Sequence, residues 1–262
     1  MVDSREVNLP GSQRMKIVIA THGWFESRPW PENLALAIRE KVDSNEWLCG
    51  WLDWRKDAKF VNPRDAAQFA RDKAGPLLAE QILKLSKNPQ HIHLIAHSAG
   101  CWAISEAAKI IARQTKASIH LTFLDAYVPL GWDPNALGDV AEEPNTIFWA
   151  DHYLTQDITL KVTDCLLKHA HNVDIGDITP GLKDHEFPRY WYHATVLGKY
   201  VPGDRYDGKE LNNGTENCEY GFSRSLEAGK INWEQSLKLP ADNKAIIIKK
   251  LTKQTHISGE KK

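Results

Sequence analysis

The sequence has no long apolar run and no excess of either charge. Its hydrophobic stretches fall short of the roughly 20 residues that a membrane-spanning helix needs, so it predicts no transmembrane segment. The formal net charge is −1 over 262 residues, whereas a nucleic-acid-binding surface needs a strong basic excess. We therefore expect neither a membrane span nor a nucleic-acid partner.

The N-terminal residues, MVDSREVNLPGSQRMK, lack the apolar core of a secretory signal peptide. This favours a cytoplasmic protein, although a mature secreted form would begin in the same way. No internal repeat is visible, and the oligomeric state stays open.

Cysteine is sparse, and no two cysteines have the C-x-x-C spacing of a zinc or redox motif. The four are Cys49, Cys101, Cys165 and Cys218. The first two fall on predicted core elements, where buried thiols are expected. The last two could pair in an oxidising compartment.

Histidine is more frequent, with eleven residues, but it does not form a recognisable metal motif. The pairs His91/His93 and His169/His171 have no third ligand at a suitable spacing. We therefore expect these histidines to be solvated or satisfied by neighbours, with no metal and no cofactor bound.

Residues 91–112, HIHLIAHSAGCWAISEAAKIIA, are the most informative stretch. The apolar run up to Ala96 is typical of a buried parallel strand, and the alanines and isoleucines after Gly100 have helical spacing. A strand that turns into a helix around x-Ser-x-Gly is a nucleophile elbow, with Ser98 at its tip. Ala96 replaces the usual first glycine. The start of the helix, at Ala99, points toward the place where an oxyanion would form.

Another loop that follows a strand and precedes a helix comes after the first predicted strand, residues 16–20 (KIVIA). It reads Thr21-His22-Gly23-Trp24, and Gly23 allows the backbone N–H of Trp24 to face a pocket. The sequence therefore predicts an oxyanion hole from the backbone amides of Trp24 and Ala99.

The remaining pattern alternates strands with helices. Strands are expected over 47–54 and 119–124, and a helix over about 64–85 is interrupted by Gly75-Pro76. Another strand is expected over 146–150, ending at Asp151-His152, and a weaker one over 245–251. This order predicts a parallel sheet covered by helices.

These motifs resemble the α/β-hydrolase fold. The segments HGW, LDW, HLIAHSAG and HLTFLDA occur in the order seen in pancreatic-lipase-type esterases and lipases and their bacterial relatives. The resemblance covers about residues 15–200. It implies one α/β-hydrolase domain over 1–262, a mostly parallel sheet with helices on both faces, an excursion over 126–145 beside the site, and a C-terminal extension over 201–262.

The resemblance also implies a catalytic triad of Ser98, Asp125 and His185, in the chain order Ser…Asp…His. His185 precedes a predicted helix running to about residue 199, in a loop like that of the catalytic histidine of this group. Asp125 and Asp151 each end a predicted strand, and both could reach that loop. The LDA context favours Asp125. His193 lies inside the predicted helix and is expected to pack in the core.

Two classes of function follow. The first is a serine hydrolase that cleaves carboxylic esters or lipids through an acyl-enzyme, with thioesterases and amidases sharing the same chemistry. The second is a weakly active or non-catalytic binding protein of the same fold. Tyr127, Leu130 and Trp132 of the excursion are candidates for acyl contacts.

Overall fold

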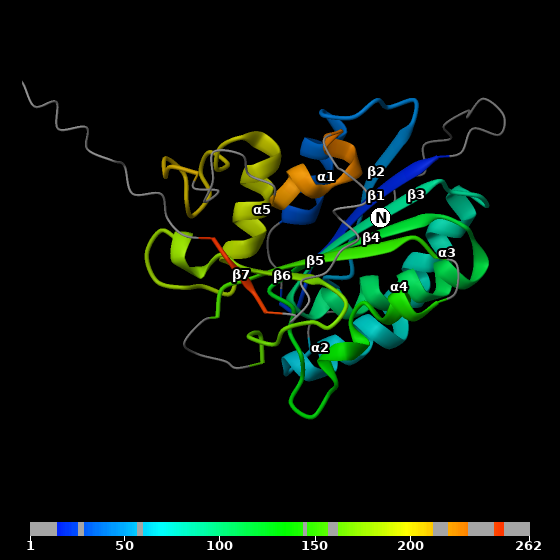
Figure 1. The fold of residues 1–262 in the computed structure, drawn as a ribbon, viewed down its shortest axis with the longest axis horizontal. Helices are drawn as coiled ribbons and strands as arrows, with labels where there is room; N and C mark the ends of the chain where they lie inside the picture. The colour runs from blue at the N-terminus through cyan, green and yellow to red at the C-terminus, as the bar shows by residue number, and fades with distance from the viewer. Residues whose placement is uncertain are drawn as a thin grey trace, which may run out of the picture.

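Among the residues that the structure describes, the central element is a parallel sheet of seven strands (Figure 1). The computed structural model describes residues 15–25, 29–56, 60–143, 146–156, 162–211, 220–229 and 244–248. The strands lie side by side in the order β2-β1-β3-β4-β5-β6-β7. Their bounds are β1 Lys16–Thr21, β2 Trp47–Leu52, β3 His91–His97, β4 Ser118–Leu124, β5 Phe148–Leu154, β6 His171–Asp174 and β7 Ile246–Ile247.

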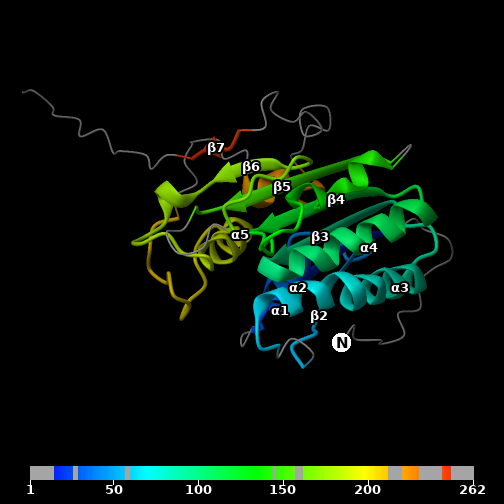
Figure 2. The same ribbon diagram turned by 90° about the horizontal axis from the view of Figure 1, so that it is seen from below.

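Helices cover both faces of this sheet (Figures 1 and 2). One face carries α1 (Trp30–Arg39) and α5 (Phe187–Leu197), and the other carries α2 (Pro63–Phe69), α3 (Gly75–Leu85) and α4 (Cys101–Gln114). A helix-covered parallel sheet with a serine at a strand-to-helix turn is the architecture of the α/β-hydrolase fold. The predicted fold class is confirmed.

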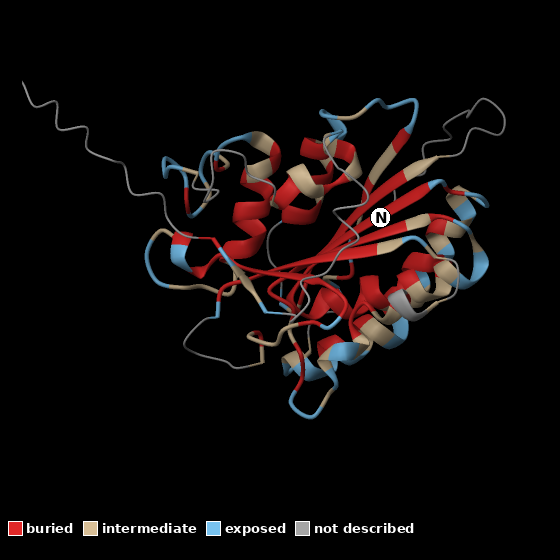
Figure 3. Ribbon diagram, in the orientation of Figure 1, coloured by how far each residue is buried: buried red, intermediate tan, exposed pale blue. Residues whose placement is uncertain are grey.

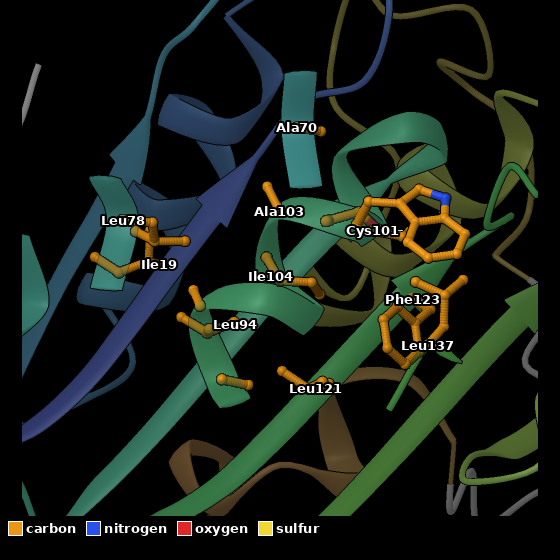
Figure 4. Packing of buried hydrophobic residues seen from close by; sticks show 14 of the residues in the cluster. Ile19, Ala70, Leu78, Leu94, Cys101, Ala103, Ile104, Leu121, Phe123 and Leu137 are labelled. Carbon is orange, nitrogen blue, oxygen red and sulfur yellow. Dashed lines mark hydrogen bonds between the residues drawn. The ribbon is translucent and has the colours of Figure 1, made fainter. Parts of the chain in front are cut away.

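Two apolar clusters, one on each face, hold the layers together. Every residue of β3 is buried, as expected for a strand covered on both sides (Figure 3). Cys101, Ala103 and Ile104 of α4 lie over Leu94 and Leu121 of the sheet (Figure 4). Truncating Leu94 or Leu121 to alanine would cost about 2–5 kcal/mol of stability.

The predicted interruption near Gly75-Pro76 is present. Residues Ala70–Ala74 form a π-helical turn between α2 and α3. A Cβ on Gly75 would lie only 2.7 Å from the carbonyl oxygen of Ala103 in α4. The absence of a side chain at Gly75 therefore allows α3 to pack directly against α4.

Some boundaries differ from the sequence prediction. Strand β5 does not end at Asp151 but continues to Leu154, because its last residues pair with β6, a strand that the sequence did not predict. Of the weak final strand, the structure describes Ile246–Ile247 as β7. Cys218 lies outside the described residues, so its pairing with Cys165 stays a prediction.

The short helical turns Gly221–Arg224 and Leu226–Ala228 lie on the same face of the sheet as α1 and α5 (Figure 1). In the part of the chain that the structure describes, no helix has the length and apolar character required to cross a bilayer.

Candidate active site

Ser98 lies at the turn between β3 and α4. The chain leaves β3 at His97, makes a single 3-10 turn over Ser98–Gly100, and enters α4 at Cys101. Ser98 has a φ of +55°, in the left-handed region that side chains disfavour. It is 8% exposed. This strained turn is the geometry of a nucleophile elbow.

Gly23 and Gly100 bring the loop after β1 into direct contact with this turn. A Cβ on Gly100 would lie 2.2 Å from the carbonyl oxygen of His22. A Cβ on Gly23 would lie 2.9 Å from Cβ of Ser98 and 3.4 Å from the amide nitrogen of Ala99. The segments carrying the amides of Trp24 and Ala99 therefore lie against one another.

Both neighbours of Gly23 are anchored to the end of β2 or to the segment beyond it. The indole Nε1 of Trp24 donates a hydrogen bond of 2.9 Å to the carbonyl oxygen of Phe60. His22 donates from Nδ1 to the oxygen of Gly23, and its Nε2 accepts from the amide of Trp54, each at 2.9 Å. Burial lowers the pKa of His22 to about 4, so the ring stays neutral at neutral pH. His22 thus supports the loop and does not titrate near pH 7.

Asp125 lies beside Ser98 at the same edge of the sheet. His97 and Leu124 are paired in the β3–β4 register, so Ser98 and Asp125 each follow their strand at equivalent positions. Asp125 is fully buried and has a φ of +46°. Its Oδ1 accepts a hydrogen bond of 3.0 Å from the amide of Thr155.

His185 forms a direct contact with Asp125. Its Nδ1 donates to Oδ2 of Asp125 at 2.7 Å. This hydrogen bond fixes the tautomer and leaves Nε2 as the basic nitrogen of the neutral ring. The ring centroid of His185 lies 4.6 Å from that of His97, the residue before Ser98. Nε2 of His97 also donates to the backbone oxygen of His185 at 2.9 Å.

Asp151 lies in a different environment. Because β5 extends to Leu154, Asp151 is paired with Thr122 in the middle of the sheet and does not mark a strand end. Its carboxylate accepts hydrogen bonds of 3.0 Å from His120 and 2.7 Å from Arg224. Burial would raise the pKa of Asp151, but the Arg224 guanidinium and His120 hold it below its usual range.

The loop that carries His185 is held in place by hydrogen bonds and an ion pair of Asp184, a role that the sequence analysis did not predict. The backbone oxygen of Asp184 accepts from the hydroxyl of Thr155, and its carboxylate accepts from Tyr206 at 3.1 Å and pairs with Arg205. Asp184 adjoins His185 in the sequence, which was a usable signal. Nothing in the sequence marked Thr155, thirty residues from Asp125.

The predicted excursion lies over α2 and α4. The indole Nε1 of Trp102 donates to the oxygen of Tyr127 at 2.8 Å, and the rings of Trp102 and Trp132 meet edge to face. Tyr127 and Trp132 are half-buried, and Leu130 is 83% exposed. This segment therefore presents apolar surface next to the end of β4, which Asp125 follows.

His193 lies on α5 and is buried, as predicted for a packing residue. Burial lowers the pKa of its ring to about 4. The structure thus brings His185 together with Asp125 and holds His193 within the core.

No family model matches the sequence, and no curated protein has significant similarity to it. Among solved structures, Aspergillus fumigatus lipase B is similar over 72% of this chain and 54% of its own, with 11% identity and a TM-score of 0.43. A structure described as FAE is similar over 55% of this chain and 58% of its own, with 13% identity and a TM-score of 0.31. This chain spans just over half the length of both.

Proposed function

We propose that this protein is a serine hydrolase that cleaves carboxylic esters through an acyl-enzyme. The observation that carries the proposal is the 2.7 Å contact between Asp125 and His185, at the sheet edge where Ser98 turns out of β3. The proposal is supported by three residues from separate elements at one edge of the sheet, a combination more specific than any one of them.

In the proposed mechanism, Ser98 Oγ attacks the ester carbonyl carbon while Nε2 of His185 takes its proton. Asp125 stabilises the imidazolium that forms. The oxyanion accepts hydrogen bonds from the backbone amides of Ala99 and Trp24. His185 then gives the proton to the leaving alcohol, and water hydrolyses the acyl-enzyme by the same steps.

Exposed apolar side chains favour an apolar acyl group. Phe25, Leu130 and Leu182 are 73%, 83% and 85% exposed, and they lie on loops that follow β1, β4 and β6 at the carboxyl side of the sheet. A substrate with an acyl chain would remove such surface from water on binding. We therefore propose that esters of longer acyl chains are better substrates than acetates.

The decisive experiment is labelling with a fluorophosphonate probe, which reacts with an activated serine. Wild-type protein should be labelled, whereas Ser98→Ala should not. Ser118→Ala is the matched control, because Ser118 begins β4 at the opposite edge of the sheet. An unlabelled wild-type protein that is folded by circular dichroism would favour a non-catalytic binding protein.

Hydrolysis of p-nitrophenyl esters of increasing chain length then tests the substrate class. The rate of hydrolysis should rise with chain length for wild-type protein and for Ser118→Ala. In Ser98→Ala the rate should be lower than in the wild type by about 10³-fold or more. If the protein cleaves thioesters or amides but none of these esters, the proposed activity would be that of a thioesterase or an amidase. The same panel tests the proposal of lipase-type activity, which the resemblance to pancreatic-lipase-type enzymes implies.

A further inference from the structure

A second group of buried polar side chains lies on the face of the sheet that carries α1 and α5. His93 of β3 and His120 of β4 are paired in register, and Glu227 reaches them from the turn Leu226–Ala228. We call these three residues the His–Glu cluster. Each is at most 7% exposed. Since His93 precedes Ser98 by five strand residues, the cluster lies about 16 Å from the elbow, outside the site described above.

One ring nitrogen of His120 is available to this cluster as a ligand atom. Its Nε2 lies 3.0 Å from Asp151, whose ionised carboxylate can only accept a hydrogen bond. Nε2 must therefore carry the proton. In a neutral imidazole only one nitrogen carries the proton, so with Nε2 protonated Nδ1 has a lone pair. This buried Nδ1 has no hydrogen-bond partner among the described residues.

Glu227 offers a carboxylate. One oxygen, Oε1, contacts Nδ1 of His93. The other, Oε2, is buried and has no hydrogen-bond partner in the described part of the chain.

One ligand-type atom from each of His93, His120 and Glu227 lies within 4.8 Å of the others. A proton on His93 Nδ1 would satisfy Oε1 of Glu227, but it would leave Oε2 and Nδ1 of His120 unpaired. Unpaired buried acceptors are unfavourable. One cation in contact with all three side chains would satisfy them together.

We propose that His93, His120 and Glu227 bind one divalent transition-metal ion of the zinc class. Imidazole nitrogen and carboxylate oxygen are ligands that zinc and cobalt accept. The surroundings have the arrangement common at such centres, in which the second nitrogen of each ligating histidine is held by a polar group. Asp151 holds Nε2 of His120, and Thr122 holds Nε2 of His93 at 2.8 Å.

The geometry narrows the choice of ion. The two imidazoles are stacked, with centroids 3.9 Å apart and planes 12° apart. Two parallel rings direct their lone pairs in parallel, so the rings must tilt to share one ion. Zinc tolerates this best, because its filled d shell imposes no preferred geometry.

The ion would act on structure and not on catalysis. It would join β3 and β4 to the segment 220–229, which also reaches the sheet through Arg224 and Asp151. Because the ligands are buried, loading would accompany folding of the chain. This inference holds whether or not Ser98 is a nucleophile.

The experiment compares the full chain refolded with a chelator and the same chain refolded with Zn²⁺. We expect one tightly held zinc per chain after dialysis and a higher melting temperature than in the chelator-treated sample. Refolding with Co²⁺ should give the visible absorption of a cobalt ion bound by nitrogen and oxygen. A folded wild-type chain that retains no stoichiometric zinc would overturn the proposal by itself.

Variants locate the ion. His120→Gln and Glu227→Gln should each bind zinc at least about 100-fold more weakly, and Asp151→Asn about 10- to 100-fold more weakly. His193→Gln is the matched control, since His193 is another buried histidine and lies on α5. Zinc retained equally by all four variants would place it elsewhere. If the ligand variants do not fold, the wild-type comparison still decides.

Discussion

Asp125 and Asp151 are two buried aspartates, one directly after β4 and one within the neighbouring strand β5, and their surroundings differ. Each contacts a histidine, at 2.7 Å for His185 and 3.0 Å for His120. The side chain of His185 is 31% exposed, whereas that of His120 is 1% exposed. Only the first pair can therefore meet a molecule from solution without unfolding.

The difference comes from the position along the strand. Asp125 follows the last residue of β4, where the chain turns and loops converge. Asp151 lies three residues before the end of β5, where neighbouring strands and the segment 220–229 enclose it. A parallel sheet thus confines substrate chemistry to its carboxyl edge and leaves polar groups below that edge to structural roles.

The largest expected contrast is between two histidines. His185→Ala should lower kcat/KM for a p-nitrophenyl ester by about 10³-fold or more, because the proposed nucleophile Ser98 would lose its proposed base. His193→Ala removes a packing residue of α5 and should mainly lower the melting temperature. A dead His193→Ala beside an active His185→Ala would reverse the assignment.

The two aspartates provide the next contrast. Asp125→Asn should lower kcat by roughly 10²- to 10⁴-fold, because an amide cannot stabilise the imidazolium that the proposed mechanism forms on His185. Asp151→Asn should retain kcat within a few-fold, measured per folded molecule by active-site titration. Equal losses in both variants would contradict the separation of the two sites.

Stability should show the opposite order. Asp151→Asn leaves the buried Arg224 without its ionic partner, which typically costs about 3–5 kcal/mol. Asp125→Asn leaves no buried cation unpaired and should cost less. Urea denaturation with chelator present measures both. An Asp151→Asn protein as stable as the wild type would mean that the Arg224 pair contributes little.

Acid should destabilise the protein before its carboxylates titrate. The pKa values of His22, His152 and His193 are lowered by burial from 6.5 to about 4. The unfolded chain therefore binds protons that the folded chain rejects. Stability is complete above pH 6.5 and falls toward pH 4, by about 1.4 kcal/mol per histidine and pH unit.

Urea titrations at pH 7.5 and 5.5 test this expectation. His193→Gln removes one of the three histidines, so its loss of stability over this range should be smaller by about 1.4 kcal/mol. A free energy of unfolding that does not change between the two pH values would show that these rings are protonated in the folded protein.

The sequence predicted the parallel sheet and the positions of Ser98 and Asp125 at its edge because these features are local. His185 follows no apolar run, and its role was expected from the resemblance of its loop to that of a catalytic histidine. Apolar runs mark buried strands, and a residue that follows such a run lies at the carboxyl edge. Residues at that edge come together whatever the rest of the chain does.

Long-range partners could not be predicted in the same way. Glu227 lies 134 residues from His93, in a region without periodicity, so no spacing could join them. Strand β6, HNVD, is short and polar, and its formation depends on pairing with β5. That pairing in turn extends β5 beyond Asp151, which is why this residue was wrongly expected at a strand end.

The left-handed backbone of Ser98 has a consequence for protein engineering. Glycine adopts this conformation without strain, so Ser98→Gly should be more stable than Ser98→Ala by about 1 kcal/mol, as thermal melting would show. Both variants would lack the proposed nucleophile. Since serine carries the same strain as alanine here, a directed-evolution campaign that selects for heat resistance alone would favour Ser98→Gly over the wild type. That variant lacks the proposed nucleophile, so screening must retain a catalytic readout at every round.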